Sequence, residues 1–423
     1  MVTRLLAGAA AAALLNLGVP AAAATTPEAP AARSFAMFGD PSVDAFYAAR
    51  GNAPLWFADG PGSPAAAELI GILKRSSAEG LDDGPGYAAQ AQMLAAQGNL
   101  LEADRQLSTG WIKYVQLLHR PTAGMVYAES WVAPRRESPL DILKLAAAAR
   151  SPDRYLQMST AVNPIYAALR DAALASGASA DPRVAASLDR VRSLPARGRY
   201  VVVDTASARL WMVDDGRIAD SMKVIVGKPD AQTPMIASAI HYATLNPYWN
   251  VPPDMVRSLI AQNVLSQGPG YLKAHGYQLL SGFGDDAQII SPKDVDWKAV
   301  ADGRAPLRVR QLPGPGNSMG HLKFGFANNA GIYLHDTPKK ELFASDDRDL
   351  SHGCIRLEDA ERLGRWLLGR DPTTASADPE QHVLLPAPVP VYVTYLTAQA
   401  NNGQLTFVDD IYQRDAGELA ALR

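Results

Sequence analysis

Apolar residues recur at helical spacing through the first part of the chain. In SPAAAELIGILKRSSAEG, residues 63–80, a serine followed by a proline opens the pattern, and Leu69, Ile72 and Leu73 share one face. The pattern returns, again with polar or proline openings, in the segments 101–120, 138–150, 163–176 and 181–194. These segments predict an α-helical domain over residues 35–194, without a concentration of catalytic side chains.

From Tyr200 onward the period changes to that of strands. Residues 200–227, YVVVDTASARLWMVDDGRIADSMKVIVG, predict a strand, an Asp-Gly turn and a second strand. Further strand patterns cover 238–246, 321–328, 331–337 and 389–398, whereas helical patterns are confined to 252–265 and 358–369. We therefore expect a β-rich domain over residues 199–412 and a C-terminal tail over 413–423.

One part of this β-rich region departs from the strand pattern. Residues 248–320 form a long stretch that is rich in glycine and proline and weakly patterned. An insertion of this kind between strands often forms a lid or a binding loop. The expected fold class is α+β, with a helical domain followed by a β-rich domain that carries a lid-like insertion over 248–320.

The beginning of the chain has a different composition. A short positive start, MVTR, precedes an apolar run from Leu5 to Val19 and then a stretch of alanine and proline. The run is shorter than the ~20 residues that span a bilayer. The order predicts a signal peptide over residues 1–24 with cleavage near Ala24, and hence an exported protein. A membrane anchor is the alternative.

Composition limits the possible partners. Hydrophobic residues make up 48% of the chain and charged residues 20%, as in globular proteins. The 40 basic and 43 acidic residues leave a formal net charge of −3. A nucleic-acid partner is not expected, because binding phosphates requires a concentrated basic surface.

The segment DLSHGCIRLED, residues 349–359, contains the chain's sole cysteine, Cys354. A lone cysteine is often a small buried hydrophobe, but in an exported protein it can also be a reactive thiol. In an extended chain His352, Cys354 and Arg356 share one face, and a nearby cation favours the thiolate. Gly353 permits close approach of the backbone, and the amides of Gly353 and Cys354 are candidate oxyanion donors. The position of the cysteine also excludes lipid attachment near the leader.

A thiol catalyst needs a base close in space. His335 ends the apolar segment GIYLH, in which Ile332 and Leu334 are expected to face the core and Tyr333 and His335 the opposite side. From the residues alone, His335 and His352 are equal candidates for the base.

Zinc is a competing use of His335, Asp336, His352 and Cys354. The spacing disfavours it, because no CxxC or HxxxH pattern accompanies these side chains. Neither a metal nor a cofactor is expected.

Residues 333–359, YLHDTPKKELFASDDRDLSHGCIRLED, closely resemble the catalytic signature of the L,D-transpeptidases. The segments VIVGKPDAQTP, NPYWNVP and RQLPGPGNSMGHLKF resemble the large periplasmic type of Gram-negative envelopes, and FYAARGNAPLWFADG resembles its scaffold domain. The resemblance covers nearly the whole chain after the leader. The small peptidoglycan-binding module usual in this type has no counterpart here, so another region or a partner protein would have to anchor glycan strands.

The resemblance implies a role for each residue around the thiol. Cys354 is the nucleophile, and His335 is the general base that later protonates the leaving amine. His352 and Gly353 shape the oxyanion pocket, Ser351 forms hydrogen bonds within the site, and Arg356 orients the loop and favours the thiolate. Tyr333 is expected to line the donor cleft, and Trp249 either belongs to a capping lid or packs in a core.

The resemblance also implies the substrates. The thiolate attacks the third residue, meso-diaminopimelate, of a tetrapeptide stem, D-alanine leaves, and an amine of a second stem attacks the thioester to give a 3→3 cross-link. Carbapenems are expected to acylate the thiol. A lysine of an outer-membrane lipoprotein is another possible acceptor. A carboxypeptidase or cross-link-cleaving hydrolase with the same thiol, and a non-catalytic wall scaffold, are the alternatives.

Overall fold

The N-terminal part of the molecule is helical, as expected. The computed structural model describes residues 40–282, 284, 286–372 and 378–415, so the expected leader and most of the tail lie outside the described residues. The helices are α1 (Pro41–Ala49), α2 (Pro64–Arg75), α3 (Gly84–Ala96), α4 (Leu100–Leu118), α5 (Pro139–Ala148), α6 (Pro152–Thr160), α7 (Pro164–Ser176) and α8 (Pro182–Val191). Many begin with proline after a capping side chain: Asn163 accepts the amide of Tyr166, and Ser138 that of Asp141.

Buried carboxylates organise the interior of this helical part. Asp104 accepts backbone amide hydrogen bonds from Leu55, Trp56 and Phe57, at 2.7, 2.8 and 2.7 Å. These bonds hold the chain between α1 and α2 against α4. A buried carboxylate is costly without such partners. The chain between α1 and α2 therefore has to adopt the conformation that supplies these amides to Asp104.

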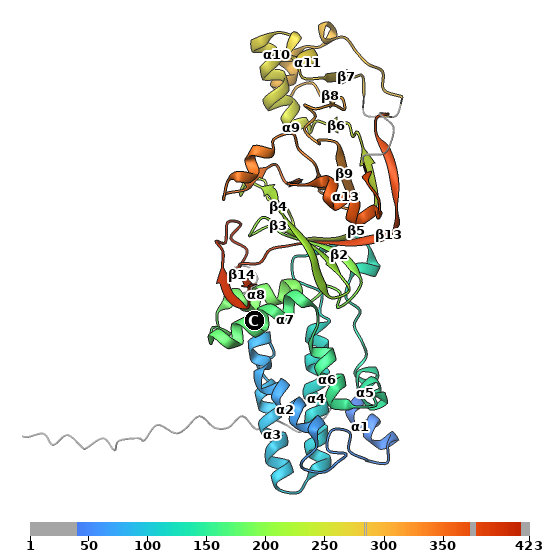
Figure 1. The fold of residues 1–423 in the computed structure, drawn as a ribbon, viewed down its shortest axis with the longest axis vertical. Helices are drawn as coiled ribbons and strands as arrows, with labels where there is room; N and C mark the ends of the chain where they lie inside the picture. The colour runs from blue at the N-terminus through green and yellow to red at the C-terminus, as the bar shows by residue number, and fades with distance from the viewer. Residues whose placement is uncertain (1–39, 283, 285, 373–377, 416–423) are drawn as a thin grey trace, which may run out of the picture. The chain divides into compact units, whose positions relative to one another are not determined.

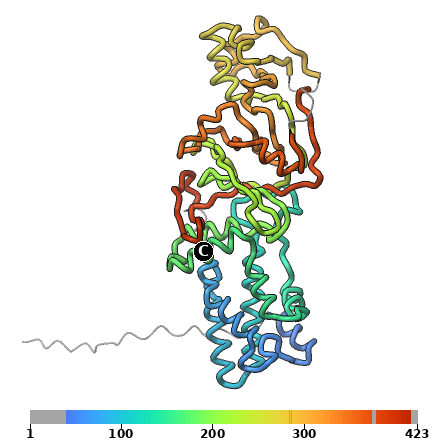
Figure 2. The backbone as a smooth tube through the Cα atoms, in the orientation of Figure 1, coloured from blue at the N-terminus to red at the C-terminus, as the bar shows by residue number. Residues whose placement is uncertain are grey.

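A mixed β-sheet forms the second part (Figures 1 and 2). Its strands follow the order β1-β5-β13-β2-β3-β4-β12-β10-β9, and a further pairing of β5 with β9 joins the end of this order back to β5. The strands are β1 (Val126–Tyr127), β2 (Arg199–Asp204), β3 (Arg209–Asp214), β4 (Arg217–Gly227), β5 (Ile236–Leu245), β9 (Leu322–Phe326), β10 (Tyr333–His335), β12 (Ile355–Leu357) and β13 (Gln381–Thr394). β11 (Asp349–Ser351) pairs with β4, and helix α13 (Ala360–Leu368) covers the apolar side of β9 and β13.

The expectation of two strands in residues 200–227 is wrong, because the segment forms three. The Asp204 carboxylate accepts the amides of Ala206 and Ser207, and Ala208 has a positive φ of 50°. This side-chain-to-backbone turn reverses the chain between β2 and β3. The expected Asp215-Gly216 turn is present between β3 and β4, with φ values of 44° and 81°.

The insertion over 248–320 folds as a small unit rather than as an irregular loop. Its strands pair in the order β6-β8-β7, and Val256, Ile260, Leu272 and Val309 belong to its own apolar core. Its elements are β6 (Trp249–Asn250), α9 (Pro253–Met255), a π-helical turn (Val256–Ile260), α10 (Ala261–Gln267), α11 (Gly270–Ala274), β7 (Tyr277–Leu280), α12 (Trp297–Ala301) and β8 (Arg308–Gln311). The insertion therefore has a core and a sheet of its own.

The helical part and the sheet are joined by shared strands. Strand β1 lies between α4 and α5 in sequence, yet it pairs in parallel with β5, Val126 opposite Ile236. The late hairpin of β14 (Ala398–Asn401) and β15 (Gln404–Phe407) contacts α7 and α8, beside which Figure 1 draws it. The buried Arg190 of α8 forms an ion pair with Asp415 at 2.7 Å.

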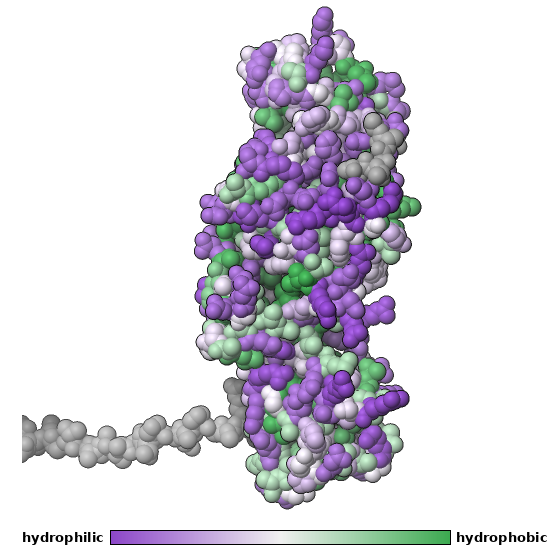
Figure 3. Space-filling view, viewed as in Figure 1, coloured by the Kyte–Doolittle hydropathy of each residue, from purple (hydrophilic) through white to green (hydrophobic). Residues whose placement is uncertain are grey.

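The surface drawn in Figure 3 mixes hydrophilic side chains with scattered hydrophobic ones. None of the helices in the described ranges is long and apolar enough to cross a membrane.

Candidate active site

Two adjacent strands bring the predicted nucleophile and base together. β10 and β12 pair in parallel, with Leu334 opposite Ile355 and His335 opposite Arg356. Leu334 and Ile355 are fully buried in the core of the sheet. Alternation along each strand therefore turns His335 and Arg356 to the other side, and Cys354 immediately precedes β12. The expected orientation of Ile332 and Leu334 toward the core is confirmed by their exposures of 5% and 0%.

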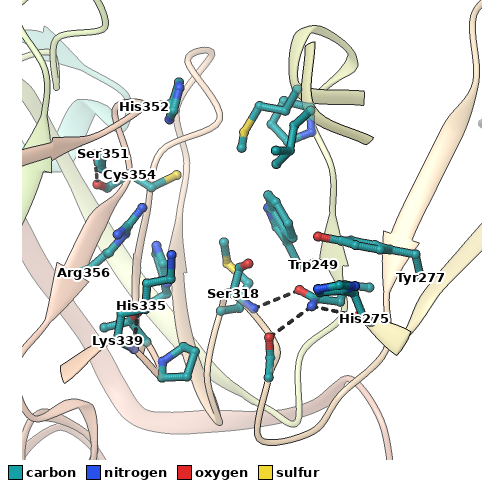
Figure 4. A pocket seen from close by; sticks show the side chains of 18 of the residues that line it. Trp249, His275, Tyr277, Ser318, His335, Lys339, Ser351, His352, Cys354 and Arg356 are labelled. Carbon is teal, nitrogen blue, oxygen red and sulfur yellow. Dashed lines mark hydrogen bonds between the residues drawn. The ribbon is translucent and has the colours of Figure 1, made fainter. Parts of the chain in front are cut away.

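These side chains line a cavity of about 430 Å³. Figure 4 shows His335, Ser351, His352, Cys354 and Arg356 on one wall and Trp249, His275 and Tyr277 of the insertion on the other. Rings from the insertion form much of that second wall: Tyr271 stacks on Tyr277 with centroids 6.0 Å apart, and Trp249 lies 6.4 Å from Tyr277. The cavity thus lies between the sheet and the insertion.

The thiol of Cys354 is half-buried, and its hydrogen points to the carbonyl of Gly331 at 3.6 Å. Burial raises the pKa of the Cys354 thiol, although the backbone amide of Tyr333 and the charges of Arg356 and Lys323 act in the opposite direction. The charge of Arg356 lowers the pKa of the Cys354 thiol, but burial raises it by more, so the thiol remains protonated at neutral pH. A thiol in this state needs a base to take its proton during attack.

His335 has the properties of such a base. It is 3% exposed, and burial lowers the pKa of its imidazole to about 4, so the ring is neutral at pH 7. Its Nδ1 lies 2.5 Å from the carbonyl oxygen of Asp336. Because a carbonyl can only accept, Nδ1 carries the hydrogen and Nε2 keeps a free lone pair.

The second histidine, His352, lies in a different environment. It lines the same cavity but is exposed to solvent. A buried ring with a defined tautomer therefore distinguishes His335 from His352.

The loop that carries the thiol is held by Ser351. Ser351 Oγ donates to the carbonyl of Cys354 at 2.6 Å and accepts the amide of Gly353 at 3.1 Å. Gly353 has a φ of 109°, and a Cβ there would lie 3.1 Å from Ile332 Cδ1. The Gly353 amide is thus directed at Ser351 and not at the cavity, contrary to its expected use as an oxyanion donor. The Cys354 amide is the candidate that remains.

A residue that the sequence analysis did not single out supports this loop from behind. Thr233 Oγ1 donates to the carbonyl of Gly353 at 2.7 Å and accepts the amide of Gly227 at 2.9 Å. The turn between them leaves no room for a side chain at Gly227, where a Cβ would lie 2.1 Å from the carbonyl of Ala231. The only sequence signal was the segment VIVGKPDAQTP, which contains both residues.

Two expected substrate-binding residues have different positions. Trp249 lines the cavity and also packs against the core of the insertion. Tyr333 does not line this cavity. Its ring lies against Lys323, whose Nζ is 5.1 Å from the ring centroid, and its backbone amide approaches the sulfur of Cys354.

A metal site was the competing use of these side chains. Within the described part of the chain, no group of three or more His, Cys, Asp or Glu side chains is arranged to hold a metal ion.

Known protein families match both parts of the chain. Residues 198–391 match the family model described as an L,D-transpeptidase catalytic domain, and residues 41–172 match the model described as a Scaffold domain. The expected α+β order, helical domain first and β-rich domain second, is confirmed by these matches.

One curated relative resembles most of the chain. It is a Haemophilus influenzae protein whose name assigns it provisionally to the L,D-transpeptidases, and it is 25% identical over 392 residues, 89% of this chain and 78% of its own length.

Solved structures resemble a smaller share. An L,D-transpeptidase from Mycobacterium smegmatis has 13% identity and a TM-score of 0.24, with 47% of this chain and 60% of its own covered. An Enterococcus faecium L,D-transpeptidase mutant has 13% identity and a TM-score of 0.23, with 48% and 52% covered. The chain therefore spans less than two thirds of the length of these structures.

Proposed function

Because the chain belongs to the L,D-transpeptidase family, we propose that it forms 3→3 cross-links between peptidoglycan stem peptides through a thioester on Cys354. The donor is a tetrapeptide stem and the acceptor is an amine of diaminopimelate in a second stem. With a signal peptide over residues 1–24, the protein works in the periplasm.

In the first half-reaction, Cys354 Sγ attacks the carbonyl carbon of the third stem residue while Nε2 of His335 takes the thiol proton. The same imidazole returns that proton to the nitrogen of D-alanine as the C–N bond breaks. D-Alanine leaves with a neutral amine, and the stem remains as a thioester. The neutral ring of His335 and its hydrogen bond to the carbonyl of Asp336 support this assignment.

In the second half-reaction, the acceptor amine attacks the thioester carbonyl and His335 takes a proton from the attacking nitrogen. The C–S bond breaks, and the proton returns to the sulfur of Cys354. Hydrolysis differs only in the acceptor: water would attack the same thioester and release a tripeptide stem.

One observation supports the proposal: β10 and β12 pair in parallel, with His335 at the end of β10 and Cys354 just before β12, and both side chains line one cavity. The product formed from a purified disaccharide-tetrapeptide tests it by mass spectrometry. A cross-linked dimer with loss of D-alanine is expected, and Cys354→Ala should form none. A tripeptide alone would assign the protein to the hydrolases.

The choice of base has its own test. His335→Ala should abolish the acyl-enzyme, whereas His352→Ala should retain most of it; the reverse result would exchange their roles. A carbapenem should add its mass to Cys354 in the wild type and in His352→Ala.

A further inference from the structure

The cavity holds two cationic side chains without a protein counterion. Among the residues that the structure describes, neither the Arg356 guanidinium nor the Lys339 amine has a hydrogen-bond or ion-pair partner, and both line the cavity. No aspartate or glutamate of these residues lines it. Arg356 is half-buried, and a buried cation without a partner is costly, whereas Lys339 is exposed at the rim of the cavity. An anionic ligand in the cavity can pair with both side chains.

The neighbouring Lys340, in contrast, has a structural role. Lys340 Nζ donates to the Asp336 carboxylate at 2.7 Å and to the carbonyls of Leu357 and Glu358, at 3.2 and 2.8 Å. Its bonds are used within the protein, and it does not line the cavity. Lys339, next to it in sequence, leaves its amine to the cavity, as Figure 4 shows on the wall that carries Cys354.

Both unpaired cations lie beside the proposed base. Arg356 is the strand partner of His335, and Lys339 follows it by four residues in the next loop. In the proposed reaction, His335 gives its proton to the nitrogen of D-alanine. The carboxylate of D-alanine is bonded to the carbon next to that nitrogen, so it has to lie close to whatever surrounds His335.

We propose that Lys339 and Arg356 bind a carboxylate next to the amine that reacts at His335. In the first half-reaction it is the carboxylate of the leaving D-alanine. In the second it is the carboxylate next to the attacking amine of the acceptor. The inference rests on the proposed function. The site then recognises the free end of the donor, so that the residue removed is the last one of the stem. It also recognises a diaminopimelate acceptor, whose attacking amine has a carboxylate on the same carbon. The side-chain amine of a lysine in a lipoprotein lacks this carboxylate and is a poor acceptor.

Two donor peptides test the inference: a tetrapeptide with a free terminal carboxylate and the same peptide with a terminal carboxamide. For the wild type, kcat/KM for acylation of Cys354 should be roughly ten- to a hundredfold lower with the carboxamide, the size of one charge-assisted hydrogen bond. Lys339→Met should lose most of this discrimination by slowing only the free acid, and Lys339→Arg should keep it. Lys298→Met, at an exposed lysine of the insertion outside the cavity, is the matched control and should behave as the wild type.

The outcomes distinguish a failure of carboxylate recognition from a failure of the proposed transpeptidase function. Equal acylation of the wild type by both peptides would overturn carboxylate recognition and leave the transpeptidase proposal intact, as would an equal loss on both peptides in Lys339→Met. Acylation by neither peptide would instead contradict the proposed function. The rate of Cys354 alkylation by iodoacetamide, a neutral probe, should be unchanged in Lys339→Met, which shows that the thiol itself is unaffected.

Discussion

The hydroxyl of Thr233 donates a 2.7 Å hydrogen bond to the carbonyl of Gly353, the residue before the proposed nucleophile. The same oxygen accepts the amide of Gly227 at the end of β4. One small side chain thereby connects the rigid sheet to the loop on which the position of the sulfur depends.

Thr233→Val keeps the shape of this side chain and removes its hydrogen bonds. The buried carbonyl of Gly353 and amide of Gly227 then lose a partner, at a cost of about 1–3 kcal/mol in the free energy of unfolding. Because the loop can shift the sulfur, we expect acylation of Cys354 to slow by about tenfold to a hundredfold. Thr233→Ser restores the hydroxyl and should recover most of the rate. Both are measured by mass spectrometry of the acyl-enzyme and by urea unfolding, and a full rate in Thr233→Val would remove this residue from the positioning of Cys354.

The acid limb of the pH–rate profile should be displaced to low pH. The pKa of His335 is lowered from 6.5 to about 4, so the ring is neutral and accepts a proton above that value and is protonated below it. Acylation should therefore be nearly constant from pH 7 down to about 5 and fall as the pH approaches 4. Single-turnover rates across pH 3–8 provide the measurement. A fall that begins near pH 6.5 would show an ordinary, exposed histidine in the role of base.

Trp249 should contribute to binding and little to chemistry, because it lies on the wall opposite the thiol. Trp249→Ala removes a large ring from that wall, and we expect KM for the donor peptide to rise about tenfold while kcat changes by less than about threefold. Leu265→Ala alters a side chain of the same insertion that is 51% exposed and should leave both constants unchanged. A loss confined to kcat in Trp249→Ala would place the ring's effect on the reacting groups instead.

Asp104 should matter for stability and not for the reaction. Asp104→Ala leaves the amides of Leu55, Trp56 and Phe57 without their acceptor, so the free energy of unfolding should fall by about 3 kcal/mol. Asp44→Ala, at an ion-paired carboxylate that is 61% exposed, should cost less than about 1 kcal/mol. Chemical denaturation measures both. Below the unfolding temperature, acylation of Cys354 should be unchanged in either variant.

Local signals in the sequence pointed to the residues around the thiol, and the family resemblance was needed to choose His335 over His352 as the proposed base. His335, Ser351, Cys354 and Arg356 lie within one short segment, and alternation along two strands predicts which way they face. Trp249 was also expected near the site, though as part of a loop. The fold class followed in the same way, because proline and capping residues mark helix starts and valine-rich runs mark strands.

The sequence did not reveal features that depend on distant segments. Thr233 lies 120 residues from Gly353, and nothing in its residue type indicates that the two meet. The helical pattern over 252–265 supplies Val256 and Ile260 to the core of the insertion, but its other members, such as Leu272 and Val309, come from short elements without a pattern of their own. Lys339 and Arg356 could be identified as unpaired only once every neighbouring carboxylate was located.

Strand β1 and two side-chain contacts connect the helical part of the chain to the sheet. The two residues of β1 come from the helical part and pair with β5. The Tyr392 hydroxyl donates to the carbonyl of Val132 at 3.3 Å, and Asp415 forms an ion pair with Arg190 of α8. A fragment cut at Arg199 would lose all three contacts and leave Ile236 and Ala237 of β5 without the strand that pairs with them on this side. We therefore expect residues 199–415 alone to be less stable than the whole chain, and a chimera that grafts them onto another carrier to need the helices as well.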